Sequence, residues 1–360
     1  MNVVHGLSQS INSQPTVLTI GVFDGVHRGH QHLISSAVAR AGVLGFQSAV
    51  LTFDPHPDFV LHPDRGRLYL SSLERRATLI AALGVDVLVV LPFGTETTAL
   101  SAAMFVDQIC TALPLRELWV GYDFALGRRR EGDLARLGEL GRERGFTVHP
   151  VEPLLIEGGP VSSSRIRAAL GEGDVVLAER LLGRFFSVEG VVVEGDKRGR
   201  TIGFPTANVA FDNQLTLPAD GVYVCEVEVG DTHHRAVTNV GVRPTFDGVR
   251  RTVEAHLLDF NGDLYGQHIG VTFRQRLRGE KKFNGIGELI EQITRDAQAA
   301  REYIAEGRTP DPLTLALSPR EREPDAPSPP GRGLGGGRRR RSMFMLFAIY
   351  VRSVTTWYMV

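Results

Sequence analysis

Apolar residues in the first half of the chain recur in short, β-branched runs that alternate with stretches of helical periodicity. The runs predict strands at 16–22, 47–53, 86–91, 117–121 and 147–151, and the stretches predict helices near 30–42, 71–83, 101–112 and 132–144. Strands that alternate with helices are typical of a parallel sheet with helices on both faces. Because such sheets bind ligands at the carboxyl ends of their strands, we expect a site at that edge.

The apolar period becomes two after a short helical stretch at 174–183. In residues 222–229 the alternation puts Tyr223, Cys225, Val227 and Val229 on one face, and the runs 252–260 and 268–277 follow with Gly-rich turns between them. Strands without intervening helices predict an antiparallel sheet or a small barrel.

Residues 285–307 return to helical spacing, and Gly307 supplies a stop signal. This stretch predicts a helix that closes a second domain. Its apolar positions are Ile286, Leu289, Ile290, Ile293, Ala297 and Ala300.

Residues 309–360 are rich in Pro, Gly and Arg and have no period that would bury a face, which predicts a disordered, adventitious tail. The apolar run at its end has only nine uninterrupted residues, 343–351, whereas a membrane span needs roughly 20. We therefore expect no membrane association. The patterns divide the chain into an extension (1–15), an α/β domain (16–182), an antiparallel β domain (183–308) and the tail (309–360).

The composition supports a folded cytoplasmic protein. Hydrophobic residues make up 42% of the 360, and the only two cysteines, Cys110 and Cys225, give neither a disulfide framework nor a metal-ligand set. The net charge of −1 hides an imbalance, because residues 309–360 carry eight Arg and four acidic residues, or +4, which leaves about −5 for residues 1–308. The folded part therefore has no basic footprint for nucleic acid.

The stretch TIGVFDGVHRGHQHL (19–33) places His27 and His30 where the first predicted strand should become a helix. A helix N-terminus offers unpaired N–H groups and the positive end of a dipole, and Gly25 and Gly29 let the backbone approach a ligand closely. Imidazoles there can donate charge-assisted hydrogen bonds to a polyphosphate whose charge grows in the transition state. Alternatively, His27 is a turn residue and His30 an exposed helix residue; the flanking strand and the FDG turn favour a phosphate site.

This stretch resembles the His-x-Gly-His motif with which the nucleotidylyltransferase superfamily binds ATP phosphates. The longer string GVFDGVHRGHQHL is similar to one branch, the bacterial bifunctional riboflavin kinase/FAD synthetases. TFDPHP (52–57), GYDFALGRRREGD (121–133) and VSSSRIRAALGEGD (161–174) fit the same branch. The resemblance implies a Rossmann-like nucleotidylyltransferase domain that adenylylates FMN.

Within that domain the resemblance implies His27, His30 and Arg165 as catalytic residues, since an arginine fork pairs with two phosphate oxygens at once. Taken alone, SSSRIR is an ordinary helix start with N-cap serines and DPHP an ordinary turn, but their order behind HRGH favours the functional interpretation. The residues implied on the ATP phosphates are Gly21, Phe23, Asp24, Gly29, Ser162, Ser163, Ser164 and Arg167, and those implied on flavin or nucleotide are His56 and Asp123.

EGDKRGRTIGFPTANVAF (194–211) combines a glycine-spaced basic loop with a hydroxyl and an amide two residues apart. A loop with Gly195, Gly199 and Gly203 can lie over phosphates, although such loops are more often plain hairpins, and oxygen ligands suit Mg²⁺. PTAN resembles the signature of the riboflavin kinase family, and NVGVRPTF (239–246) and VEAHLLDF (253–260) agree with it. The resemblance implies a β-barrel kinase domain with Thr206 and Asn208 on Mg²⁺-ATP, Glu254 as the base and Arg243 on flavin or nucleotide.

The resemblance therefore implies a cytoplasmic enzyme that uses ATP and Mg²⁺ to phosphorylate riboflavin to FMN and then to adenylylate FMN to FAD, with no nucleic-acid or membrane partner. One alternative is a nucleotidylyltransferase acting on another phosphorylated small molecule, with the second domain as a lid. The other is a binding protein in which GRGLGGGRRRR (331–341) and the apolar end carry the function, because Arg-Gly segments bind single strands electrostatically.

Overall fold

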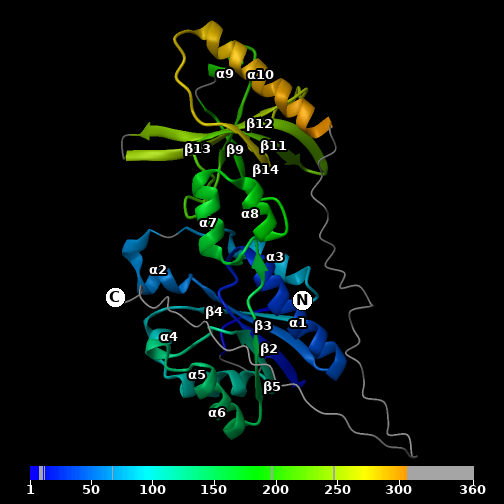
Figure 1. Ribbon diagram of the computed structural model, residues 1–360, viewed down its shortest axis with the longest axis vertical. Coiled ribbons are helices and arrows are strands. Elements are labelled where there is room, and N and C mark those ends of the chain that lie inside the picture. The colour runs from blue at the N-terminus through cyan, green and yellow to red at the C-terminus, as the bar shows by residue number, and fades with distance from the viewer. Residues whose placement is uncertain (8–10, 12, 67, 196–197, 246–247, 306–360) are drawn as a thin grey trace, which may run out of the picture. The chain divides into compact units, whose positions relative to one another are not determined.

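The structure is a computed structural model that describes residues 1–7, 11, 13–66, 68–195, 198–245 and 248–305. Its N-terminal part contains a six-stranded sheet in the order β1-β4-β3-β2-β5-β6, in which every pairing is parallel (Figure 1). The predicted α/β fold is confirmed. The strands are β1 (Asn2–His5), β2 (Thr16–Ile20), β3 (Gln47–Asp54), β4 (Val87–Pro92), β5 (Leu115–Gly121) and β6 (Thr147–Val151).

Strand β1 was not predicted. Residues 1–15 were expected to form an extension, but Asn2–His5 pair in parallel with Val87–Val90 of β4 and add an edge strand. The four-residue segment NVVH is too short to show a period, and most of it is exposed, as an edge strand allows.

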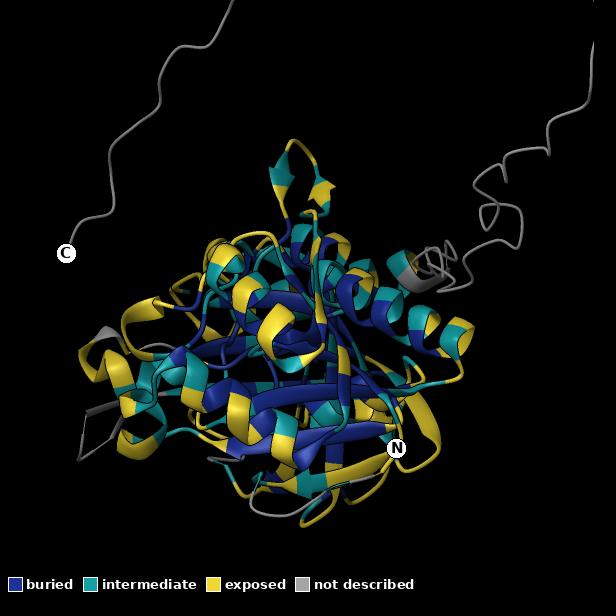
Figure 2. Cartoon of the chain, turned by 90° about the horizontal axis from the view of Figure 1, so that it is seen from below, coloured by how far each residue is buried: buried dark blue, intermediate teal, exposed yellow. Residues whose placement is uncertain are grey.

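Helices cover both faces of this sheet because its central strands are apolar on both sides. Leu18 and Ile20 of β2 pack with α5 (Ala102–Ala112) and α6 (Leu134–Arg144), whereas Val17 packs against α1 (Arg28–Leu44). Helix α3 (Leu73–Ala81) joins the α1 side through Ile80. Figure 2 shows buried residues concentrated in the strands and exposed residues on the outer sides of the helices.

Short elements connect the main ones and carry several of the candidate site residues. They are η1 (Asp24–Val26), α2 (Pro57–Leu61), η2 (Pro63–Arg65), α4 (Thr95–Ala99), η3 (Arg128–Arg130), the hairpin β7 (Leu155–Ile156) and β8 (Gly159–Pro160), and α9 (Arg198–Thr201).

The C-terminal part is a closed antiparallel barrel in the order β10-β13-β12-β11-β14-β9, which confirms the prediction of a small barrel. The period-two face of β11 points into the barrel, where Tyr223, Cys225 and Val227 are fully buried. Helices α7 (Ser163–Glu172) and α8 (Val175–Leu182) pack onto the same core. The strands are β9 (Ser187–Val193), β10 (Ala207–Ala210), β11 (Gly221–Val229), β12 (Thr232–Thr245), β13 (Gly248–Leu257) and β14 (His268–Arg278).

Helix α10 (Ile286–Ala305) covers the outer face of the barrel, as predicted for a closing helix. Ala297 and Ala300 pack there against Val222, Val224 and Val237, whereas Ile286 at the start of the helix is 63% exposed.

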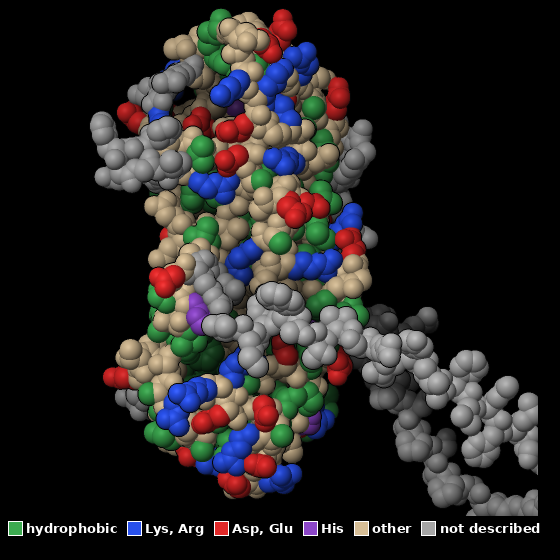
Figure 3. Space-filling view, turned by 60° about the vertical axis from the view of Figure 1, so that its left-hand side comes forward, with side chains coloured by type: hydrophobic (Ala, Val, Ile, Leu, Met, Phe, Trp, Pro, Cys, Tyr) green, Lys and Arg blue, Asp and Glu red, His purple; other side chains and the backbone are tan. Residues whose placement is uncertain are grey.

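The stop at Gly307 and the tail lie outside the described residues. Within the described part of the chain, no helix combines the length and the apolar character needed to cross a membrane. On the face seen in Figure 3, acidic and basic side chains are interspersed.

Candidate active sites

A cavity of about 820 Å³ opens at the carboxyl ends of β2, β3, β4 and β5, the edge at which a parallel sheet was expected to bind its ligand. One part of its wall is aromatic and the other carries Arg128, Arg129 and Arg130. It therefore suits a ligand that combines a flat apolar ring system with anionic groups. The aromatic lining residues are Phe53, Phe93, Phe105 and Phe124.

The turn that leads from β2 into α1 has an unusual backbone. Phe23, Gly25 and Val26 have φ values of 53°, 75° and 37°, all in the left-handed region. For a β-branched residue such as Val26 this conformation is a genuine outlier, which persists only where surrounding contacts over-determine it. Gly21 and Gly29 lie on either side of the turn, and a Cβ on Gly29 would come within 3.2 Å of the His27 ring.

The two histidines stack on one another at the start of α1. Their ring centroids lie 3.5 Å apart, and His27 Nδ1 accepts a hydrogen bond of 3.2 Å from the His30 backbone N–H as the N-cap of the helix. His30 also packs edge-on against Phe23, and its own Nδ1 is buried without a hydrogen-bond partner among the described residues.

Burial lowers the pKa of His27 to about 3, and burial together with the His27 and Arg76 charges lowers the pKa of His30 well below 6.5. Both imidazoles are therefore neutral at pH 7, so the charge in a hydrogen bond from either ring to a phosphate would come from the phosphate. Because His27 Nδ1 accepts the capping bond, its ring proton resides on Nε2, which is the atom that can donate to an anion.

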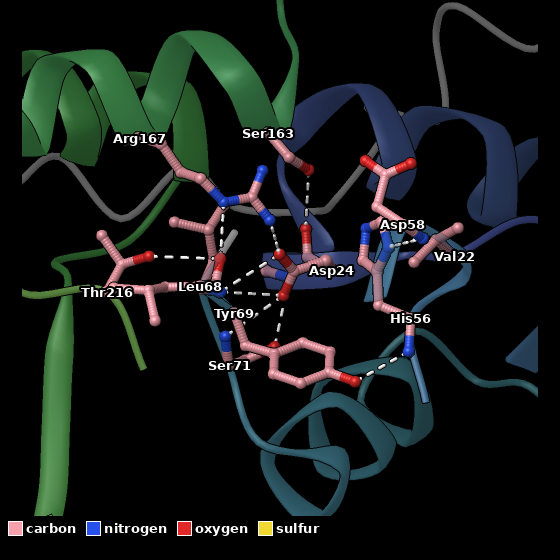
Figure 4. A network of polar contacts seen from close by, with 12 residues as sticks. Val22, Asp24, His56, Asp58, Leu68, Tyr69, Ser71, Ser163, Arg167 and Thr216 are labelled. Atoms are coloured by element: carbon pink, nitrogen blue, oxygen red, sulfur yellow. Dashed lines mark hydrogen bonds and ion pairs between the residues drawn. The ribbon is translucent and has the colours of Figure 1, made fainter. Parts of the chain in front are cut away.

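Asp24 anchors the turn instead of meeting phosphate, contrary to the expectation. Its carboxylate is 1% exposed and accepts hydrogen bonds from the backbone N–H groups of Leu70 and Ser71, and Arg167 forms an ion pair with it (Figure 4). Burial raises the pKa of Asp24, although Arg167 and Arg76 oppose the shift. Arg167 also donates to the Leu68 carbonyl at 2.7 Å, so its guanidinium is engaged with protein groups. Phe23 is likewise a core residue, 1% exposed.

The serines of the SSSRIR motif have three different roles. Ser162 is the N-cap of α7, the ordinary helix start weighed above, and Ser164 is exposed. Ser163 lines the cavity and donates a hydrogen bond of 3.0 Å to the Asp24 carbonyl. Arg165 does not line the cavity, because its Nη1 donates to the carbonyls of Ile156 and Gly159 at 2.7 and 3.0 Å and holds the β7–β8 hairpin.

His56 and Asp123 both line the cavity, as expected of flavin or nucleotide contacts. His56 is the N-cap of α2, where its ring Nδ1 accepts a hydrogen bond of 3.0 Å from the Asp58 backbone N–H. The backbone N–H of His56 donates to the Tyr69 hydroxyl (Figure 4). Asp123 is exposed, and its carbonyl accepts from Arg130 at 2.8 Å.

Two further cavities lie on the barrel. One of about 590 Å³ is lined by Glu254 and by residues of α10, and one of about 320 Å³ is lined by residues 260–265 and Arg200. Thr206 lines both, so it stands where the two cavities meet. On β13, Val253, Ala255 and Leu257 point into the barrel, and Glu254 therefore points outward toward the larger cavity.

The strand register places two amides beside Glu254. Asn208 on β10 and Asn239 on β12 are its direct partners on either side, so the three side chains form one row on the outer face of the barrel. Asn239 was not predicted as a site residue, since nothing in its local sequence shows that it pairs with Glu254.

Two of the three glycines of the predicted phosphate loop are closely packed. Residues Arg198–Thr201 form the short helix α9, and a Cβ on Gly199 would come within 2.3 Å of the Phe204 carbonyl oxygen. A Cβ on Gly195 would come equally close to the side-chain amide of Asn208. Of the three glycines, only Gly203 has a left-handed φ, 88°. Arg243 lies on β12 but lines neither barrel cavity.

Sequence reasoning also missed the arginines of η3, although they stand inside the GYDFALGRRREGD string. Arg129 and Arg130 have φ values of 57° and 60°, an uncommon conformation for residues other than glycine. Three adjacent basic residues after a strand were a readable signal for an anion site.

Comparisons with known proteins match both halves of the chain. A family model described as FAD synthetase matches residues 9–165, and one described as riboflavin kinase matches residues 182–304. The bifunctional riboflavin kinase/FMN adenylyltransferase of Bacillus subtilis is 41% identical over 81% of this chain and 94% of its own length. The protein of the same name from Escherichia coli K12 is 40% identical over 83% and 96%.

Among solved structures, a chain titled macrolide-efflux protein from Streptococcus pneumoniae superimposes with a TM-score of 0.77. It is 32% identical and the match covers 84% of this chain and 99% of the other.

Proposed function

Because the chain belongs to the family of bifunctional riboflavin kinase/FMN adenylyltransferases, we propose that the sheet-edge cavity and the barrel cavities are its two active sites. The protein phosphorylates riboflavin with ATP to give FMN and then adenylylates FMN with ATP to give FAD and pyrophosphate. The assignment of residues to these two steps is our proposal.

We place the boundary between the two modules at residues 182–183; the family matches end at 165 and start at 182, so neither covers residues 166–181. Since β1 belongs to the sheet, we assign residues 1–15 to the first module. The tail at 309–360 lies outside the described residues and is given no role. A chain truncated after Gly307 is expected to keep both activities, and a loss of either would revive the alternative in which the tail carries function.

In the adenylyl transfer, an oxygen of the FMN phosphate attacks the α-phosphorus of ATP, and the bond from that phosphorus to the pyrophosphate oxygen breaks. The nucleophile is already an anion, so the protein has only to position and stabilise charge. The donors that we propose for the triphosphate are His27, through its neutral Nε2–H, the His30 ring and the backbone at the start of α1. The single proton of the Ser163 hydroxyl is already donated to the Asp24 carbonyl, so Ser163 holds the turn. The arginines of η3 supply positive charge in the sheet-edge cavity, whereas His27 and His30 are not among the residues that line it.

In the kinase step, the Glu254 carboxylate accepts the proton of the riboflavin 5′-hydroxyl as that oxygen attacks the γ-phosphorus of ATP and ADP leaves. Asn208 and Asn239 on either side orient the carboxylate. The cavity of about 590 Å³, which is bounded by Leu289 and Ile293 of α10, offers an apolar wall for the flavin ring.

The donors near Glu254 fit Mg²⁺. The Thr206 hydroxyl and the Asn208 amide are hard oxygen ligands, and Mg²⁺ usually takes few protein ligands besides water and substrate phosphates. The described residues contain no group of three or more His, Cys, Asp or Glu suited to a metal ion, so a cage made of protein alone is not offered there. When bound, the ion would neutralise phosphate charge. The cytoplasmic location, which rests on the two cysteines, stays a prediction.

The observation that carries the proposal is the row Asn208, Glu254, Asn239, in which Glu254 and Asn239 line the larger barrel cavity. To test it, Glu254→Gln, which keeps the shape and removes the base, is incubated with ATP and Mg²⁺ plus either riboflavin or FMN, and the flavins are separated by chromatography. FMN formation should fall about 10²- to 10⁴-fold while supplied FMN still gives FAD. Glu228→Gln, an exposed site on β11, is the matched control. Equal loss of both activities would show that Glu254 is structural.

A further inference from the structure

Arg184 stands at the junction between the two family matches, and its guanidinium reaches back to the first module. It belongs to the stretch matched by the riboflavin kinase model, 182–304. Its Nη2 donates to the Gly25 carbonyl at 2.7 Å and its Nη1 to the Val26 carbonyl at 3.3 Å, and both carbonyls belong to the stretch matched by the FAD synthetase model. A third bond, of 3.4 Å, joins Nη1 to the Leu182 carbonyl.

Gln31 of α1 reinforces the same link. Its Nε2 donates to both the Val26 carbonyl and the Leu182 carbonyl at 2.8 Å. Two side chains thus tie the turn before His27 to the end of α8, one from each side of the junction. A Cβ on Gly183 would come within 3.0 Å of the Arg28 side chain, so the chain runs close to α1 at this point.

The bonded carbonyls belong to the strained part of the turn. Gly25 and Val26 both have left-handed φ values, and Val26 immediately precedes the N-cap His27. A strained β-branched residue returns to a relaxed backbone when its restraints are removed, and His27 would move with it.

Arg184 makes all of its hydrogen bonds within the described residues to backbone carbonyls and none to a carboxylate. Burial and repulsion from Arg75 lower the pKa of Arg184 to about 10, against the attraction of Asp24, and the group is still charged at pH 7. A partly buried guanidinium without a carboxylate partner costs desolvation free energy. Its presence here is therefore consistent with a functional role for Arg184 and not with a gain in stability.

We propose that Arg184 is a positioning residue for adenylyl transfer, which holds the Gly25–Val26 turn so that His27 faces the triphosphate of ATP. The inference rests on the proposed role of His27. It makes a residue at the start of the kinase module a determinant of the reaction in the other module.

The test compares Arg184→Met with wild type and with Arg180→Met, an exposed arginine four residues earlier that pairs with Glu157. In Arg184→Met, kcat for conversion of FMN to FAD should fall about 10- to 100-fold with KM for FMN little changed, as a misplaced catalytic group predicts. Riboflavin phosphorylation in the same polypeptide should stay within about twofold of wild type, which also reports folding. Arg184→Lys should recover only part of the loss, because an ammonium cannot span two carbonyls as a guanidinium does.

Hydrogen exchange gives a second readout that a general loss of stability would not produce. Amides of residues 22–31 should exchange faster in Arg184→Met than in Arg180→Met, with the barrel strands unchanged. Gln31→Leu, which removes the other side-chain donor to the Val26 carbonyl, should reproduce the selective loss of FAD formation.

Adenylyl transfer close to wild type in Arg184→Met, or an equal fall in both activities in both variants, would overturn the inference. Failure of the proposed function is distinguishable, since it would appear as undiminished FAD formation in His27→Asn.

Discussion

Substitution of His27 by asparagine should remove a pH dependence of stability that the buried imidazole creates. Asparagine is a good N-cap, so His27→Asn keeps an acceptor for the His30 N–H while it deletes the titrating group. Burial lowers the pKa of His27 from 6.5 to about 3 in the folded protein. The folded state therefore excludes a proton that the unfolded chain takes up.

The sign and size follow from that difference. Because the folded pKa lies below the unfolded one, the stabilisation is complete above pH 6.5 and is lost as the pH falls toward 3. As the pH falls from 7 to 5, the unfolded chain takes up most of one proton at this position and the folded chain almost none. The free energy of unfolding therefore decreases by about 2 kcal/mol through this group. Wild type should therefore lose about 2 kcal/mol more than His27→Asn over this interval.

Urea unfolding followed by tryptophan fluorescence measures this difference in the correct module. The chain has two tryptophans, and Trp119 lies on β5 of the parallel sheet. In a Trp357→Phe background the signal comes from Trp119 alone. His149 stacks on Trp119 and is present in both proteins, so its effect on the fluorescence cancels in the comparison.

Equal pH dependence of wild type and His27→Asn would refute the reasoning, because it would mean that His27 titrates in the folded state as it does in the unfolded chain. A larger loss in His27→Asn would refute it as well, because it would mean that folding raises the pKa of His27 instead of lowering it.

Three further predictions concern other parts of the molecule. Arg165→Ala should lower FAD formation less than about tenfold, because Arg165 holds the β7–β8 hairpin; a loss of 10³-fold or more would restore the phosphate clamp expected from the sequence. Phe273→Ala should destabilise the barrel by about 3–5 kcal/mol, since the ring is fully buried, and urea titration of FMN formation would detect it; a loss under about 1 kcal/mol would contradict the packing. Burial raises the pKa of Cys225 to about 12, so iodoacetamide at pH 8 should modify Cys110 first and Cys225 only after unfolding, as read by mass spectrometry; early labelling of Cys225 would be inconsistent with the closed barrel.

Local patterns were sufficient to predict most of the elements. The strands of the parallel sheet are nearly continuous apolar runs, whereas apolar residues in the barrel strands recur with a period of two. Helices α3, α5 and α6 have the N-caps Ser72, Ser101 and Asp133, and each of these side chains accepts a hydrogen bond from a backbone N–H of its helix. Strands β9, β10 and β12 of the barrel were not predicted, and neither was β1, a four-residue edge strand that gains its order from pairing with β4.

The arginines of α7 illustrate why the roles of site residues were harder to predict. Arg165 and Arg167 are two positions apart, or about 200° around a helix, so they face different surroundings. Arg167 meets the buried Asp24 and Arg165 the hairpin carbonyls, and only the packing of α7 decides which arginine does which. The charge of the histidines was likewise decided by burial, which the motif does not encode.

The sequence by itself determined the family and the two folds, because these depend on local periodicity and on contiguous motifs such as HRGH and PTAN. Tertiary structure decided the rest. Asn239 comes to Glu254 through strand register, Arg184 comes to the turn before His27 through the junction of the modules, and the imidazoles lose their charge through burial. Contacts between residues far apart in the chain, and the desolvation that accompanies them, arise only when the whole chain has packed.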